Sequence, residues 1–92
     1  MIDHFELSRF QRTYTINTVD RKGRRTNIAS FGDAPMQRSM LIESLALAMS
    51  RTMVEDLVLV NVTEHDIDNM KLAAVTVAGG ALVRAMEEQV QA

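Results

Sequence analysis

Polar and apolar positions alternate along residues 10–19, FQRTYTINTV. The side chains that share the apolar face are Phe10, Tyr14 and Ile16. This two-residue period predicts a β-strand with one face in water. The Asp-Arg-Lys-Gly segment at 20–23 is typical of a tight turn in which the glycine takes a positive φ. A second strand over 24–31 follows, so the sequence predicts a β-hairpin with an exposed turn.

The pattern becomes helical after residue 33. Asp33 is placed to cap a helix N-terminus and Pro35 suits the first turn, so we predict a helix from there to residue 52. One wide apolar arc of this helix is formed by Leu41, Ile42, Leu45, Ala48, Met49 and Met53. A second apolar stripe is formed by Met36, Met40 and Leu47. The first arc can lie on a sheet, and the second needs another cover.

The remaining pattern predicts one more strand and one long helix. The near-continuous apolar run at 57–62 indicates a strand buried on both faces. Thr63 and Asp66 then match a capping box, so we predict a helix over 64–88. The Gly79-Gly80 pair weakens the middle of this helix. It marks either a kink or a point of close packing, and the pattern does not decide between the two.

These elements predict a single α+β domain, residues 1–92, with the order β-β-α-β-α. The simplest assembly is a two-layer sandwich, in which a three-stranded, mainly antiparallel sheet carries two helices on one face. We expect strand 57–62 to lie antiparallel beside strand 10–19, after a right-handed crossover from strand 24–31. The residues before position 10 are assigned to no element, and His4 is expected in a frayed terminus without a role.

Composition narrows the function classes. The chain has no cysteine, which excludes disulfides, thiolate catalysis and cysteine-ligated zinc. No apolar run reaches the length of a membrane span, and the N-terminal segment is too polar for a signal peptide. The sequence has no glycine-rich phosphate loop, and nothing places a base beside a serine. We therefore expect a soluble, cytoplasmic, non-enzymatic protein without a cofactor or a membrane partner.

Charge is divided unevenly along the chain, although the net charge is only −2. Residues 9–25 carry six basic side chains against one carboxylate, a net charge of +5, whereas residues 55–68 carry −5. The acids of this second segment form a candidate secondary surface: Glu55, Asp56, Glu64, Asp66 and Asp68. Such a division bears on partners rather than on fold. A metal site at His65 is not expected, because acids are favoured at a helix N-terminus in any case.

The basic turn is the main candidate site. Its four cations fall within five positions: Arg21, Lys22, Arg24 and Arg25. Three further residues are expected to extend this surface: Arg9, Arg12 and Asn27. Arginine binds phosphate or carboxylate through two parallel hydrogen bonds, which lysine cannot do. A concentration of like charge indicates a counter-charge on another molecule, and the alternative is an ordinary solvated turn.

The chain as a whole resembles a known group. The opening MIDHFELSRFQRTYTINTVDRKGRRTNIASFGDAP and the length of 92 residues are similar to the small phage-encoded anti-CRISPR proteins that inhibit type I-F surveillance complexes (Csy, or Cascade). That group has no common signature or fold, so the resemblance assigns no site residue here. It implies a non-enzymatic inhibitor that binds subunits of this ribonucleoprotein in the host bacterial cell and blocks recognition of target DNA.

In that setting, the basic hairpin would contact the backbone of the guide RNA, and segment 55–68 would contact the basic protein surface that holds DNA. The competing interpretation is an autonomous nucleic-acid-binding regulator that uses the same hairpin. A net charge of −2 and the near absence of aromatic side chains from the wet strand face count against it. The sequence leaves direct RNA contact and homodimerisation through the helices open.

Overall fold

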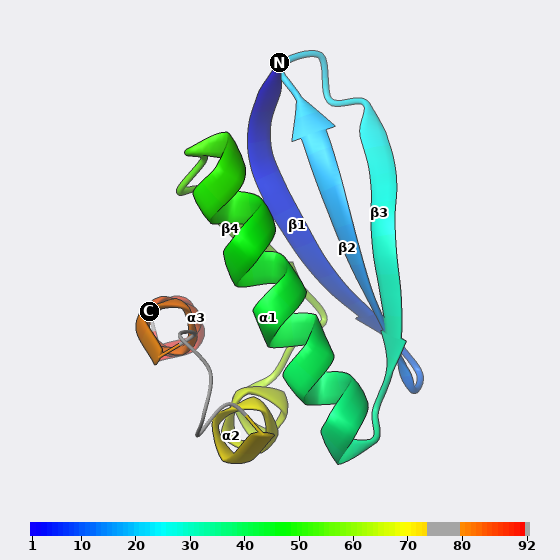
Figure 1. Ribbon diagram of the computed structural model, residues 1–92, viewed down its shortest axis with the longest axis vertical. Helices are drawn as coiled ribbons and strands as arrows, with labels where there is room; N and C mark the ends of the chain where they lie inside the picture. Colours follow the sequence, from blue (N-terminus) through cyan, green and yellow to red (C-terminus); the bar gives the residue numbers. More distant parts are fainter. Residues whose placement is uncertain (74–79, 92) are drawn as a thin grey trace.

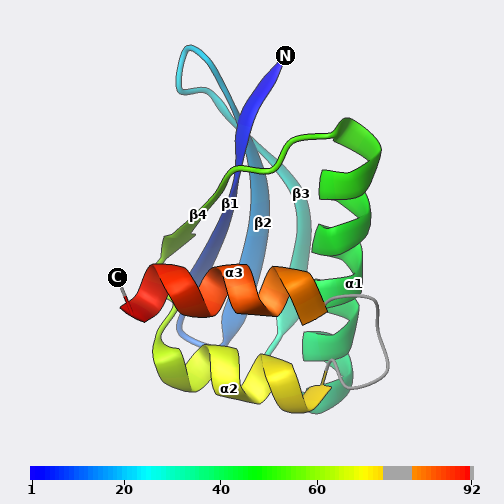
Figure 2. The ribbon, with the colours of Figure 1, turned by 90° about the vertical axis from the view of Figure 1, so that its left-hand side faces the viewer.

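The computed structural model describes residues 1–73 and 80–91. Within these residues, the elements in chain order are β1 (Ile2–Phe10), β2 (Thr13–Asp20), β3 (Arg25–Gly32), α1 (Pro35–Thr52), β4 (Leu57–Val60), α2 (Glu64–Ala73) and α3 (Gly80–Gln91). The strands form one sheet in the order β3-β2-β1-β4 (Figure 1). The three helices lie on one face of this sheet and leave the other face open (Figure 2). The predicted α+β class and the one-sided helix layer are thus confirmed.

The predicted hairpin is present. Strands β2 and β3 pair antiparallel, from Thr13 opposite Gly32 to Val19 opposite Arg25. Gly23 takes the expected positive φ, +80°, and its N–H donates to the Asp20 carbonyl at 3.0 Å. The turn therefore forms because glycine accepts a backbone conformation that L side chains rarely adopt.

The prediction of a three-stranded sheet is wrong, because the N-terminal residues form a central strand. β1 pairs antiparallel with β2 on one side and parallel with β4 on the other. It buries Phe5 and Leu7 in the core, so this segment is not frayed. β1 separates β4 from β2, although β4 does run antiparallel to β2 as expected. The sheet is mixed because β4 runs parallel to β1, whereas the other two strand pairs are antiparallel.

β4 is also more exposed than its apolar run predicted. It ends at Val60, and the next residue, Asn61, has a positive φ of 60°. Val58 and Val60 are 42% and 36% exposed, whereas Leu57 is buried. The strand is therefore covered by helices on one face only, and the prediction of burial on both faces is wrong.

The single helix predicted over 64–88 is two helices that fold back on each other. Lys71 Nζ on α2 lies 2.8 Å from Glu87 Oε1 on α3. In one continuous helix these two positions would be about 24 Å apart. Gly80 begins α3, and a Cβ added there would meet nothing within 4 Å, so it is not a point of close packing. Gly79 lies outside the described residues.

The reversal places both helices over the sheet, side by side (Figure 2). Each then contributes to one core, which consists of Phe5, Leu7, Tyr14, Ile16, Leu41, Ile42, Leu45, Leu57, Val62, Ile67, Met70, Val83 and Met86. In the folded-back arrangement, Met70 of α2 and Met86 of α3 are both fully buried in this core. Burial of apolar surface from both halves therefore favours the folded-back arrangement.

Helix α1 differs from prediction at its start. Its N-cap is Ala34 without a side-chain hydrogen bond, so Asp33 does not cap it. The Asp33 carboxylate instead accepts from Arg38 Nη1 at 3.0 Å. The helix ends at Thr52, and its C-cap residue, Met53, has a φ of 57° in the left-handed region. No helix in the described ranges is long and apolar enough to cross a membrane.

The two apolar arcs of α1 have different environments. Leu41, Ile42 and Leu45 are fully buried against the sheet. The second stripe stays in solvent, with Met36 75% exposed and Leu47 48% exposed. The cover that the sequence pattern demanded is thus not supplied by the described part of the chain.

A pair of glycine substitutions tests the turn. Gly23→Ala should lower the free energy of unfolding by about 1 kcal/mol, because alanine is strained at this φ. Gly80→Ala is the matched control and should raise the same quantity by as much as about 1 kcal/mol, because its Cβ enters open space and favours the helix. Urea unfolding followed by circular dichroism measures both. Changes of the same sign would contradict this account.

Candidate functional site

The tip of the β2–β3 hairpin is held in shape by Asp20. Its Oδ1 accepts from the backbone N–H of Lys22 at 2.9 Å and of Arg24 at 3.0 Å. Its Oδ2 accepts from Arg24 Nε at 2.7 Å. The backbone and side-chain hydrogen bonds of Arg24 lower the pKa of Asp20. One carboxylate therefore orders the turn and offsets the charge of Arg24.

Arg25 is also paired within the chain. It spans the open face of the sheet to Glu6, with Nε 3.1 Å from Oε1 and Nη2 3.2 Å from Oε2. Asn17 Nδ2 donates to the same Oε1 at 3.3 Å, and Asn27 Nδ2 donates to Asn17 Oδ1 at 3.4 Å. Glu6 is only 6% exposed, and the hydrogen bond from Arg25 lowers its pKa. Arg25 and Asn27 thus belong to a polar network that joins β1, β2 and β3.

Two cations at the tip have no ion-pair partner among the described residues. Arg21 and Lys22 are exposed, and neither forms an ion pair with any residue in 1–73 or 80–91. Arg24 is 73% exposed despite its bond to Asp20, so it still adds to the potential of the tip. The predicted cluster of four free charges is therefore two free charges beside one partly neutralised arginine.

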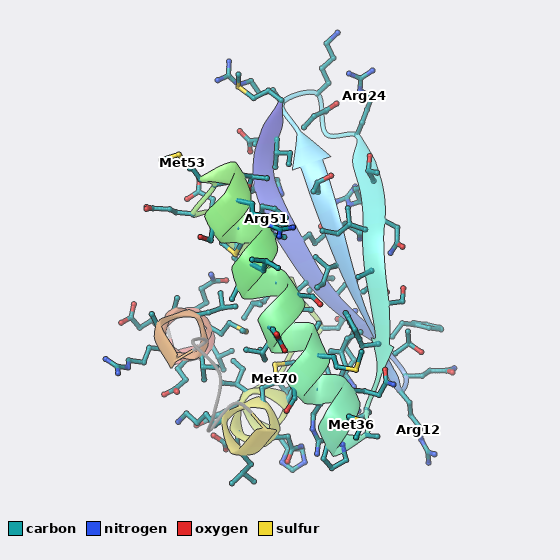
Figure 3. All side chains as sticks on the ribbon, viewed as in Figure 1. Arg12, Arg24, Met36, Arg51, Met53 and Met70 are labelled. Carbon is teal, nitrogen blue, oxygen red and sulfur yellow. The ribbon has the colours of Figure 1, made fainter. Side chains whose placement is uncertain are left out.

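Arg9 and Arg12 do not extend this surface. They lie near the β1–β2 turn, whereas the hairpin tip lies at the opposite end of β2; Figure 3 shows Arg12 and Arg24 at the two ends of the sheet. Arg12 is exposed and follows Gln11, which has a positive φ of 55°. The sequence brought these cations together along the chain, and an eight-residue strand separates them by about 25 Å.

Arg9 instead belongs to an internal network around Asp66. Its Nη1 forms an ion pair with Asp66 Oδ1, and its guanidinium lies 5.3 Å from the centre of the Tyr14 ring. The Tyr14 hydroxyl donates to the same Asp66 oxygen at 2.9 Å. Asp66 is 1% exposed, so this is a buried carboxylate whose charge is compensated by Arg9 and which accepts a hydrogen bond from the Tyr14 phenol.

Asp66 also caps α2, as predicted. The backbone N–H of Thr63 donates to Asp66 Oδ2 at 2.8 Å, and the Asp66 N–H donates back to Thr63 Oγ1 at 3.3 Å. The capping box is therefore confirmed. Its carboxylate has a second role, the buried ion pair with Arg9, which the local pattern did not show. Only the contact between β1 and the start of α2 reveals that role.

Asp33 extends the network to α1. Its Oδ2 lies 3.3 Å from Arg9 Nη2, and its Oδ1 pairs with Arg38 Nη1 at 3.0 Å. Tyr14 is fully buried below these groups. Burial raises the pKa of Tyr14, and the negative charge of Asp33 adds to the shift. The phenol therefore stays protonated and acts as a hydrogen-bond donor.

The five acids of the predicted secondary surface do not lie together on one surface. Asp66 is buried, whereas the other four acids are exposed. Glu55 and Asp56 precede β4, whose first residue, Leu57, aligns with Phe5 of β1. Phe5 also aligns with Thr18 near the hairpin tip, so Glu55 and Asp56 lie at the same end of the sheet as the free cations. The molecule therefore has an end of mixed charge rather than two opposed charged faces.

The other two acids lie at the far end. Glu64 and Asp68 stand on α2, where both raise the pKa of Lys71 after the larger effect of its hydrogen bond to Glu87. No group of three or more His, Cys, Asp and Glu residues in the described ranges is arranged to hold a metal ion. His65 lies 3.3 Å from Asn69, through Nε2 and Nδ2.

The described residues also form a groove that no sequence pattern indicated. A groove of about 610 Å³ lies between the C-terminal half of α1 and α3. Its apolar lining includes Met49, Met53, Leu82 and Ala85, and its polar lining includes Ser50 and Glu55. Such a lining suits apolar groups rather than a highly charged substrate. No local signal could have located it, because it depends on how α3 folds back.

Comparison of the chain with protein-family models, with curated proteins and with solved structures finds no match in any of the three.

The Tyr14–Asp66 contact gives a direct stability test. Tyr14→Phe should lower the free energy of unfolding by about 1–3 kcal/mol, because the buried carboxylate loses a donor. Asp66→Asn should also destabilise, and the double variant should cost less than the sum of the two. Urea unfolding of all four proteins measures the coupling. Additive effects would show that the hydroxyl and the carboxylate do not interact.

The Glu6–Arg25 pair should make stability depend on pH. The pKa of Glu6 is lower in the folded chain than its ordinary value of 4.5, so its contribution is present above that value and is lost as the pH falls through the folded pKa. Arg25→Gln should therefore raise the pKa of Glu6 and reduce stability more at about pH 7 than at about pH 3.

The measurements are NMR titration of the Glu6 carboxyl and urea unfolding at both values of pH. Arg12→Gln is the control, because Arg12 has no ion pair with a described residue. An unchanged Glu6 pKa in the Arg25 variant would contradict the pairing.

Proposed function

We propose that the chain is a non-catalytic binding protein that uses the β2–β3 hairpin tip to contact an anionic surface on a larger partner. The observation that carries this proposal is the state of the charges at the tip. Arg21 and Lys22 are exposed and form no ion pair with the described residues, whereas Arg9 and Arg25 are bound to buried carboxylates. The tip also projects beyond the helix layer (Figure 2), so a partner can reach it.

The turn is suited to this role because it is preorganised. Asp20 fixes the backbone at Lys22 and Arg24, and Gly23 provides the reversal. A binding loop that is already ordered loses less conformational entropy on association. The free arginine offers two parallel hydrogen bonds to phosphate, and the lysine adds charge without fixed geometry.

The resemblance to anti-CRISPR inhibitors supplies a specific partner for this proposal, a type I-F surveillance complex whose recognition of target DNA is blocked. Such a ribonucleoprotein presents guide RNA phosphates beside basic protein grooves that hold DNA. The mixed-charge end of the chain suits it, because Glu55 and Asp56 lie at the same end of the sheet as Arg21 and Lys22. The tip would meet the RNA backbone, and the two acids would meet the basic protein.

Charge reversal at the tip tests the proposal. Arg21→Glu/Lys22→Glu should weaken binding to a purified type I-F surveillance complex by about tenfold or more, because two attractive contacts become repulsive. The matched control is Arg12→Glu/Arg84→Glu, which changes the net charge by the same amount on exposed residues away from the tip. Biolayer interferometry over a salt series measures both affinities.

Three outcomes are distinguishable in this experiment. Loss in the tip variant alone supports the proposed contact. Equal losses in both variants would reduce the effect to net charge, and failure of the native chain to bind would remove this complex as the partner. A gel shift with free RNA and DNA is run in parallel, and salt-sensitive binding in the micromolar range would favour the autonomous regulator instead.

A further inference from the structure

The outward face of α1 carries apolar side chains that the described part of the chain does not cover. Met36, Met40 and Leu47 are 75%, 46% and 48% exposed. At 100° per residue they lie opposite the buried arc of the same helix. α1 has 18 residues and is therefore about 27 Å long, which is enough for a helix partner to lie along it.

The residues around Leu47 on this face are arranged symmetrically, with a serine and then a charged residue on each side of it. Ser44 and Ser50 lie three positions before and after Leu47, and Glu43 and Arg51 lie four positions before and after it. These spacings place all five side chains on one face of the helix. Figure 3 shows Arg51 on α1, and neither Glu43 nor Arg51 forms an ion pair within residues 1–73 and 80–91.

Such a pattern is complementary to itself when a second helix runs in the opposite direction. With a two-fold axis at Leu47, each Glu43 faces Arg51 of the other copy, and each Ser44 faces Ser50 of the other copy. The serines are small and allow the helix backbones to approach. Within one chain, Glu43 and Arg51 are about 12 Å apart along the axis and cannot pair directly.

We propose that α1 is a homodimerisation surface, on which two copies of the chain pack antiparallel about a two-fold axis through Leu47. The interface is isologous, because the same residues contribute from both copies. One helix pair buries less surface than a standard protein–protein interface, so the dimer is weak and depends on concentration. This proposal is independent of the hairpin function, since it involves none of the tip residues.

A charge swap tests the predicted register. Glu43→Arg places two arginines opposite each other in each half of the interface, and Arg51→Glu does the same with two glutamates. Each single variant should raise the dimer dissociation constant by about tenfold. The double variant Glu43→Arg/Arg51→Glu restores opposite charges across the axis, so it should dimerise as the native chain does. Leu47→Glu should abolish dimerisation.

Sedimentation equilibrium over a concentration series measures the dissociation constants, and circular dichroism verifies that each variant is folded. The exchange Arg84→Glu/Glu88→Arg on α3 is the matched control and should leave dimerisation unchanged. Recovery in the α1 double variant after loss in both single variants supports the antiparallel register. A native chain that stays monomeric up to about 1 mM overturns the proposal, and so does a double variant as weak as the single ones.

Discussion

The fold depends on the buried carboxylate of Asp66. It joins the sheet to the second half of the chain, because it pairs with Arg9 of β1, accepts from Tyr14 of β2 and caps α2 through Thr63. A carboxylate that is 1% exposed is tolerated only when its hydrogen-bonding capacity is filled. The position of α2 on the sheet, and with it the return of α3, is therefore fixed by polar groups as well as by apolar burial.

This constraint also determines which charges face outward. Arg9, Arg25 and Asp66 belong to dense charge segments of the sequence, and each forms an ion pair within the chain. Among the charges without an ion pair in the described residues, Arg21 and Lys22 lie in the turn between β2 and β3, and Glu43 and Arg51 lie on α1. Arg21 and Lys22 share one end with Glu55 and Asp56, so the external field is mixed and local rather than strongly dipolar.

The two surfaces proposed for binding differ in kind. The hairpin tip is polar, small and ordered by Asp20, which suits an anionic partner. The outward face of α1 is apolar along Met36, Met40 and Leu47, with a pair of opposite charges around its centre, which suits a second copy of the same helix. They use different residues and different elements, so a dimer would present two hairpin tips.

The sequence by itself determined the local structure: the hairpin with Gly23, the extent of α1, the capping box at Thr63 and the two apolar arcs of α1. Each follows from side-chain period or turn chemistry within a few residues. Only the tertiary structure decided that β1 enters the centre of the sheet, that α2 and α3 fold back, and which arginines remain free. These features depend on contacts between distant segments, such as Arg9 with Asp66 and Glu6 with Arg25, and a local pattern contains no information on which carboxylate an arginine will meet.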